Sequence, residues 1–231
     1  MIKAILFDFY ETIVTFDPPR EELQAEACRR FGVEIDPQAI PRAYWVADDF
    51  LSRENAHLSV QQRSPEELKE FWASYEAILL KEAGVEVSPE LALRIATRLR
   101  QLDRGLVLFD DVLPVMKSLK ARGTIFGLIS NLNRSLGDSC SELGLAPYID
   151  FAITSSEVGS EKPHSPIFLA ALERAGVSPS EAIHVGDQYN SDVVGAKGAG
   201  INPLLLDRHG FWGAVDDCPR ISSLGEIMNY L

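Results

Sequence analysis

The chain has 231 residues, of which 46% are hydrophobic and 24% charged, as in ordinary soluble globular proteins. Its formal net charge of −12 disfavours nucleic acid and anionic membranes as partners. No membrane span or signal peptide is predicted, and three scattered cysteines disfavour a disulfide framework or a zinc site, so we expect a cytoplasmic protein.

The first predicted element is a short apolar strand that ends at Asp8. No strand is predicted between residues 18 and 104, where capping residues and apolar spacing predict only helices. These helices span residues 20–31, 39–56, 64–82 and 88–102. The helical region carries an aromatic set that we expect to form its own core: Trp45, Phe50, Phe71, Trp72 and Tyr75.

Strands and helices alternate in the remainder of the chain. Helices are predicted over 111–121, 134–143, 165–175 and 191–199, and strands over 124–129, 151–155, 182–185 and 203–206. This alternation is typical of a parallel sheet with right-handed crossovers. The predicted fold is therefore a doubly wound, Rossmann-like α/β core of residues 1–16 and 104–231, with an all-helical domain inserted over 17–103.

Three predicted strands end in polar residues, and a lysine follows a fourth strand by a short loop. The residues are Asp8, Ser130 with Asn131, Asp187 and Lys162. Ligands bind at the carboxyl ends of the strands in open parallel sheets, so we expect these side chains to converge. Such a set suits attack by a carboxylate on an electrophile that carries negative charge.

In this interpretation Asp8 is a nucleophile that forms a covalent aspartyl intermediate. Ser130 and Asn131 would hold substrate oxygens, and Lys162 would neutralise charge at the reacting centre. Asp187 could share a divalent cation with Asp8, because two close carboxylates are costly without a positive charge between them.

Four segments resemble, in order, the four motifs of the haloacid dehalogenase-like hydrolase superfamily. They are residues 7–12 (FDFYET), 129–131 (ISN), 157–163 (EVGSEKP) and 186–192 (GDQYNSD). The resemblance implies that the helical insert is the family's cap, which closes over the site, excludes water and carries substrate specificity. One departure is His164, which stands where an aspartate is usual.

A second departure from the phosphatase pattern is Tyr10. Most phosphatases of this superfamily carry an aspartate there, which protonates the leaving group and later activates water. A phenol is a poor base at neutral pH, and the family's 2-haloacid dehalogenases do have a tyrosine at this position. A cap residue such as Glu54 or His57 could replace the missing acid, or the substrate could have a good leaving group. Glu11 is disfavoured, because an extended neighbour of Tyr10 points away from it.

The last motif favours the metal-dependent members of the family. The resemblance implies that Mg²⁺ is held by Asp8, by the backbone carbonyl of Tyr10 and by Asp187, with Asp192 in an outer position. The substrate-binding residues that it implies are Asn131, Tyr10 and Thr12, of which Thr12 has a largely orienting role.

The favoured interpretation is a magnesium-dependent phosphatase of a small anionic metabolite, with no nucleic acid or membrane partner. The first alternative is a metal-independent 2-haloacid dehalogenase, in which Arg42 or Arg53 could accept the halide. The second is a binding protein with a weakened site. The glycines at 195, 198 and 200 lie in a predicted helix and not between strand and helix, so we interpret them as packing residues and not as a nucleotide loop. The sequence does not predict the oligomeric state.

Overall fold

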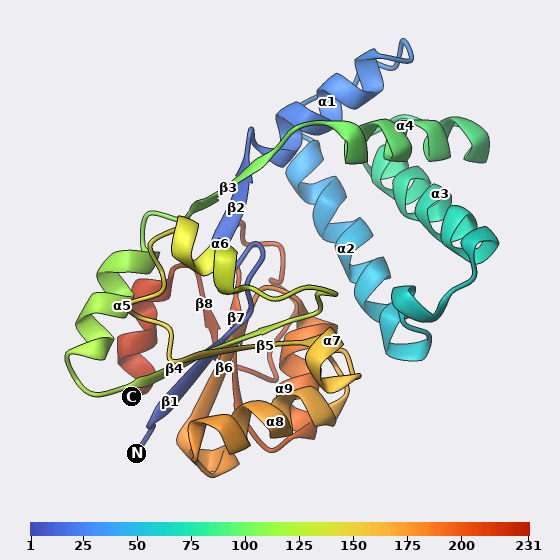
Figure 1. Ribbon diagram of the computed structural model, residues 1–231. Coiled ribbons are helices and arrows are strands. Elements are labelled where there is room, and N and C mark those ends of the chain that lie inside the picture. The colour runs from blue at the N-terminus through green and yellow to red at the C-terminus, as the bar shows by residue number, and fades with distance from the viewer. The chain divides into compact units, whose positions relative to one another are not determined.

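The computed structural model describes residues 1–231 and divides into two compact units (Figure 1). One unit consists of residues 1–15 and 107–231, and the other of residues 16–106. The predicted junctions were residues 16 and 104, close to the observed 15 and 107. No helix is both long and apolar enough to cross a membrane.

The larger unit is built on a six-stranded sheet in the order β5-β4-β1-β6-β7-β8, and every strand pair is parallel. The strands are β1 (Ala4–Phe7), β4 (Ile125–Ser130), β5 (Phe151–Thr154), β6 (Ala182–Gly186), β7 (Asn202–Leu206) and β8 (Arg220–Ile221). The doubly wound α/β fold predicted from the sequence is confirmed. The two-residue β8 was not predicted.

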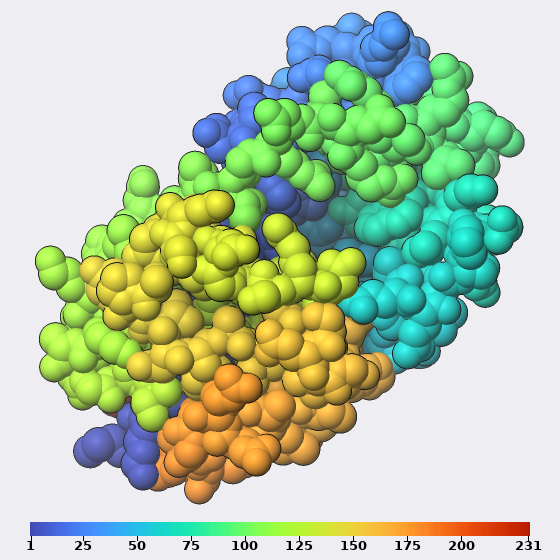
Figure 2. All heavy atoms as spheres, viewed as in Figure 1, coloured from blue at the N-terminus to red at the C-terminus, as the bar shows by residue number.

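Helices cover both faces of this sheet. They are α5 (Val112–Lys120), α6 (Gly137–Glu142), α7 (Ser155–Val158), α8 (Ser165–Ala175) and α9 (Gly195–Gly198). Helix α5 and the C-terminal segment lie on one face, and α8 and α9 lie on the other (Figure 1). In the space-filling view the side chains hide most of the sheet (Figure 2). Strand β1 is fully buried, which explains why its sequence is an almost continuous apolar run.

Two helix predictions in this unit were wrong in their bounds. The helix predicted over 134–143 begins only at Gly137, because residues 131–136 form a loop after β4. The helix predicted over 191–199 is a π-helical segment, Tyr189–Val194, followed by α9. The strand predicted over 151–155 ends at Thr154, because the short helix α7 begins at Ser155.

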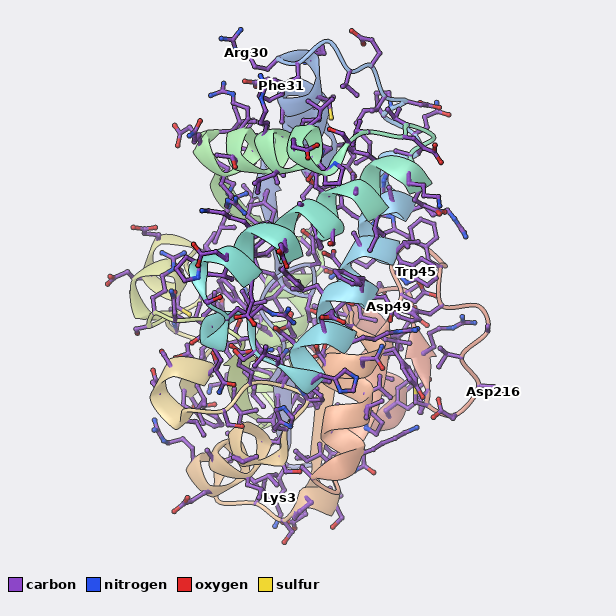
Figure 3. The ribbon with its side chains drawn as sticks, turned by 90° about the vertical axis from the view of Figure 1, so that its right-hand side faces the viewer. Lys3, Arg30, Phe31, Trp45, Asp49 and Asp216 are labelled. Atoms are coloured by element: carbon purple, nitrogen blue, oxygen red, sulfur yellow. The ribbon has the colours of Figure 1, made fainter.

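The smaller unit contains four α-helices, as the sequence predicts: α1 (Arg20–Arg29), α2 (Ile40–His57), α3 (Pro65–Glu82) and α4 (Pro89–Gln101). Helix α3 begins with a capping box, in which Ser64 and Glu67 each accept a hydrogen bond from the other's backbone N–H. In the aromatic set, Phe71 stacks on Phe50, and Trp72 contacts both Phe71 and Tyr75. Trp45 is half-buried on α2, one turn before Asp49 (Figure 3).

Two short strands were missed by the sequence analysis. β2 (Val14–Asp17) and β3 (Gly105–Leu108) pair in a separate two-stranded sheet. They contain the points at which the chain leaves and re-enters the larger unit. Only Val14 is buried in β2, and β3 has no buried residue, so neither strand shows the buried apolar run by which the strands of the larger sheet were recognised.

A chain of buried polar groups crosses the interior of the helical unit. Glu76 on α3 is only 1% exposed and accepts a hydrogen bond of 2.5 Å from Nε2 of Gln24 on α1. Oε1 of Gln24 in turn accepts a hydrogen bond from the Tyr44 hydroxyl at 2.8 Å. Burial raises the pKa of Glu76 to about 7, although the Gln24 hydrogen bond and the charge of Arg100 oppose this rise.

We expect Glu76 to make the stability of the protein depend on pH. Its pKa in the folded protein exceeds the ordinary value of 4.5. Its contribution to the free energy of unfolding is therefore fully present below pH 4.5 and is lost as pH rises through 7. The loss amounts to about 3 kcal/mol. Glu76→Gln keeps the acceptor for Gln24 and cannot ionise, so this variant should lack that part of the pH dependence.

Urea unfolding of the wild type and the variant between pH 4 and 8 measures the effect. Glu70→Gln is the matched control, because Glu70 is exposed on the same helix and its replacement should leave the pH profile unchanged. Parallel profiles for the wild type and Glu76→Gln would contradict the assignment.

Candidate active site

The strand register brings the predicted residues to one edge of the sheet. Phe7 at the end of β1 pairs with Leu128 of β4 and with Val185 of β6. Asp8 therefore lies beside the carboxyl ends of both neighbours, where Ser130 and Asp187 are found. Lys3 marks the opposite, amino end of β1 (Figure 3). The sequence prediction that these side chains converge rests on the same rule.

A buried lysine joins two of the aspartates. Nζ of Lys162 lies 2.5 Å from Oδ1 of Asp8 and 2.6 Å from Oδ1 of Asp192. Lys162 and Asp192 are 3% and 1% exposed, whereas Asp8 retains 8%. Burial lowers the pKa of Lys162, but the two carboxylates more than offset this effect and raise its pKa above the ordinary value. Lys162 is therefore a fixed positive charge against Asp8.

Both carboxylate oxygens of Asp192 are bound by donor groups of the protein. Oδ1 also lies 2.9 Å from Nε2 of His184, and Oδ2 accepts a hydrogen bond of 3.0 Å from the backbone N–H of Gln188. Burial favours the protonated acid, but Lys162 and His184 together hold the pKa of Asp192 well below its ordinary value. Asp192 therefore orients Lys162, and the sequence analysis missed the part that His184 plays in this arrangement.

Gly186 makes room for this carboxylate. A Cβ atom at Gly186 would lie 2.1 Å from the carboxyl carbon of Asp192. The structure shows that the space is filled by the Asp192 side chain.

Asp187 is half-buried directly after β6, and Nε2 of Gln188 donates a hydrogen bond of 2.8 Å to its Oδ2. Burial raises the pKa of Asp187 well above its ordinary value, and the charges of Asp8 and Asp192 raise it further. Three carboxylates whose charges act on one another thus have one ammonium group among them, and that group contacts only Asp8 and Asp192. This excess of negative charge is the electrostatic condition under which a divalent cation binds.

No three His, Cys, Asp or Glu side chains are grouped so as to hold a metal ion. Because Asp192 is occupied by protein donors, the carboxylates left for a cation are those of Asp8 and Asp187. Mg²⁺ is usually bound through one or two carboxylates and keeps several waters, so this donor set fits Mg²⁺. It does not fit Zn²⁺, which takes three or four protein ligands.

Asn131 holds the backbone of Lys162 at both sides. Its Oδ1 accepts a hydrogen bond of 2.7 Å from the Lys162 N–H, and its Nδ2 donates one of 2.9 Å to the Lys162 carbonyl. We expected Asn131 to hold substrate oxygens, whereas these contacts fix the loop that carries the lysine. Ser130, directly before Asn131 in the chain, is 3% exposed at the end of β4.

The chain turns sharply after Asp8. The backbone N–H groups of Ile13 and Val14 both donate to the Phe9 carbonyl at 3.1 Å, and the Glu11 N–H donates to Val14 at 2.7 Å. Glu11 has a φ of 55°, which only a small share of non-glycine residues adopt. Glu11 was disfavoured as an acid on the premise that the backbone is extended here, and this premise was wrong. The negative charge of Glu11 also contributes to the raised pKa of Asp187.

The other two residues of this turn differ in exposure. Tyr10 is half-buried, and its ring packs edge-on against Phe9 with 5.1 Å between ring centroids. Thr12 is completely buried, and no protein group hydrogen-bonds its hydroxyl. The Thr12 carbonyl accepts a hydrogen bond of 2.9 Å from Arg208, whose guanidinium also forms a two-pronged ion pair with Asp111. The position of Thr12 is thus set by its backbone.

The cap residues suggested from the sequence all lie on α2, in the helical unit. Arg42 pairs with Glu82, Arg53 with Asp49, and Glu54 with Arg63. His57 lies in the last turn of the same helix. Their suggested roles, in halide binding and in acid catalysis, stay predictions.

The model of the haloacid dehalogenase-like hydrolase family matches residues 2–200. The chain belongs to this family. It is 29% identical to the glyceraldehyde 3-phosphate phosphatase of Methanopyrus kandleri over 90% of this chain and 85% of the relative. It is 28% identical to the ribulose-1,5-bisphosphate 5-phosphatase of Halopiger xanaduensis, again over 90% and 85%.

Two solved structures show the same resemblance in three dimensions. The 2-haloacid dehalogenase from Pseudomonas syringae and a HAD phosphatase from Thermococcus onnurineus are each 26% identical to this chain, with a TM-score of 0.59. Each alignment covers 99% of this chain and 97% of the other. The family assignment made from the four motifs is therefore confirmed.

Proposed function

We propose that this family member is a magnesium-dependent phosphatase with Asp8 as its nucleophile. The observation that carries the proposal is the pair of contacts from the buried Lys162 ammonium to Asp8 and Asp192. The negative charges of both aspartates act on Asp187 and raise its pKa. The two relatives named as phosphatases support it. Because they are named after a triose phosphate and a pentose bisphosphate, we propose small phosphorylated sugars as the substrate class.

In the proposed cycle Lys162 holds Oδ1 of Asp8, so Oδ2 attacks phosphorus. The bond between phosphorus and the alcohol oxygen breaks, an aspartyl phosphate forms, and the alcohol departs with a proton taken from solvent water, since Tyr10 stands where the family's acid would be. Water then attacks the phosphorus of this intermediate, which releases phosphate and restores the carboxylate. Lys162 stabilises the charge on the transferring group, and the backbone contacts of Asn131 keep its ammonium group in place.

Asp8, Asp187 and the backbone carbonyl of Tyr10 would hold Mg²⁺. When bound, the ion supplies positive charge to the phosphoryl oxygens and relieves the repulsion between the two carboxylates. Asp192 contributes indirectly through Lys162.

We expect Tyr10→Asp to accelerate the hydrolysis of alkyl phosphates. Tyr10 stands where an aspartate would supply an acid, and such a group typically contributes 10²- to 10⁴-fold, so a gain of about tenfold or more is expected. Hydrolysis of p-nitrophenyl phosphate should change less, because its leaving group needs no proton. Phosphate release from both substrates is the measurement.

Tyr10→Asn is the matched control, since it removes the phenol without adding an acid. A fall in the turnover of both substrates in Tyr10→Asp, equal to that in Tyr10→Asn, would show that the tyrosine has its own role.

The alternative of a 2-haloacid dehalogenase is favoured by Tyr10 and by the solved dehalogenase with 26% identity. The purified protein assayed with p-nitrophenyl phosphate, glyceraldehyde 3-phosphate and 2-chloropropionate, each with Mg²⁺ and with a chelator, separates the two functions. We expect phosphate release that requires Mg²⁺. Halide release that is unaffected by the chelator would overturn the phosphatase proposal, and inactivity in every assay would favour the binding protein.

A further inference from the structure

The loop over residues 207–219 follows β7, and it projects from the unit at Asp216 (Figure 3). Its first residue, Asp207, is buried and accepts hydrogen bonds from the backbone N–H groups of Phe211 and Trp212, at 2.8 and 3.2 Å. These bonds fold the first part of the loop back toward the carboxyl end of β7. None of the four family motifs lies in this loop.

Trp212 connects the loop to the candidate active site. Its indole N–H donates a hydrogen bond of 3.0 Å to the backbone carbonyl of Asp187, and its ring lies 5.9 Å from the ring of Tyr189. Farther along the loop, Asp217 accepts hydrogen bonds from the Tyr189 hydroxyl at 2.8 Å and from Lys197 at 2.5 Å. The loop is thus attached to the segment after β6 at two separate points.

Asp187 needs such support because of its surroundings. Its carboxylate lies near the charges of Asp8 and Asp192, which repel it, and the attractive contact on its side chain comes from the adjacent Gln188. A hydrogen bond to the Asp187 carbonyl from a large, half-buried ring opposes a rotation of this peptide away from the other two acids. Partners of this kind commonly change metal affinity by 10- to 100-fold.

We propose that Trp212 is a positioning residue that holds Asp187 in place for Mg²⁺ through its indole N–H. The inference rests on the proposed function, because it assumes that Asp187 binds the ion. The 207–219 loop would thereby keep the backbone of Asp187 in the position that the metal site requires.

The test is the Mg²⁺ affinity of Trp212→Phe, measured by isothermal titration calorimetry on the full chain. Phenylalanine keeps an aromatic ring in the loop and removes the N–H donor, so we expect the affinity to fall about tenfold. Tyr189→Phe is the matched control. It removes one hydrogen bond of the same loop but leaves the Trp212 donor in place, and its affinity should stay within about twofold of the wild type.

A second measurement does not require a change at Trp212. The chain has three tryptophans, so the double variant Trp45→Phe, Trp72→Phe leaves Trp212 as the sole tryptophan, whose emission is excited selectively at wavelengths where tyrosine does not absorb. Titration with Mg²⁺ should change its fluorescence with a midpoint equal to the dissociation constant from calorimetry. This readout decides the question if Trp212→Phe does not fold.

The outcomes separate the two proposals. A wild type that does not bind Mg²⁺ would overturn the magnesium-dependent function, and the inference with it. A wild type that binds Mg²⁺ while Trp212→Phe binds it equally well would overturn only the role of Trp212. Equal losses in Trp212→Phe and Tyr189→Phe, or an unchanged Trp212 emission during binding, would also overturn it.

Discussion

Asp8→Asn is expected to lower phosphate release by about 10⁴-fold or more while leaving the fold intact. The amide has nearly the same shape and can still accept the hydrogen bond from Lys162, but it cannot act as the nucleophile. Removing the nucleophile of a hydrolase typically has an effect of at least this size. Steady-state assays with p-nitrophenyl phosphate measure the loss, and thermal unfolding checks the fold.

The covalent step can be tested in the same experiment. Acid quenching of the wild type during turnover, followed by peptide mass spectrometry, should find a phosphoryl group on Asp8 and none in Asp8→Asn. The control is Asp138→Asn, because Asp138 is exposed on α6 and its replacement should leave turnover unchanged. Turnover above a tenth of the wild-type value in Asp8→Asn would contradict the assignment of the nucleophile.

Lys162→Met is expected to reduce both stability and turnover. The buried ammonium stabilises Asp8 and Asp192, and its loss leaves two buried carboxylates without their counter-charge. Breaking a buried ion pair in this way typically lowers the free energy of unfolding by about 3–5 kcal/mol. Urea unfolding measures the loss, and Mg²⁺ should restore part of it because the ion would compensate the charge of Asp8, although not that of Asp192.

The same substitution at Lys120 provides the control. Lys120 also forms an ion pair, 2.6 Å from Asp150, but both side chains are about one-third or more exposed. Such surface pairs contribute about 1 kcal/mol or less. Equal losses of stability in Lys162→Met and Lys120→Met would contradict the claim that the buried ion pairs of Lys162 stabilise the fold more than an exposed pair does.

The convergence of the candidate site was predictable because it depends on a general property of parallel sheets. Asp8, Ser130 and Asp187 were each recognisable as polar residues at the end of an apolar strand, and strand register alone brings such ends together. The helical unit was equally predictable, because its capping serines and apolar spacing are local signals.

The partners of the site residues were not predictable, because hydrogen bonds between distant segments leave no local pattern. Nothing in the sequence indicates that Asn131 binds the backbone of Lys162, or that His184 contacts Asp192. Trp212 could have been noticed as an aromatic residue in the loop after a predicted strand of the same sheet. Its hydrogen bond to Asp187 requires the structure.

The pairing of β2 and β3 has a consequence for how this chain could change. The N–H of Phe109 donates a hydrogen bond of 3.2 Å to the carbonyl of Ile13, so the chain leaves the larger unit and returns to it at neighbouring positions. A short turn could join them in place of residues 16–106. The helical unit could therefore be deleted, or replaced by another domain, at two chain positions that lie side by side. Asp8 and Lys162 would both remain in the larger unit.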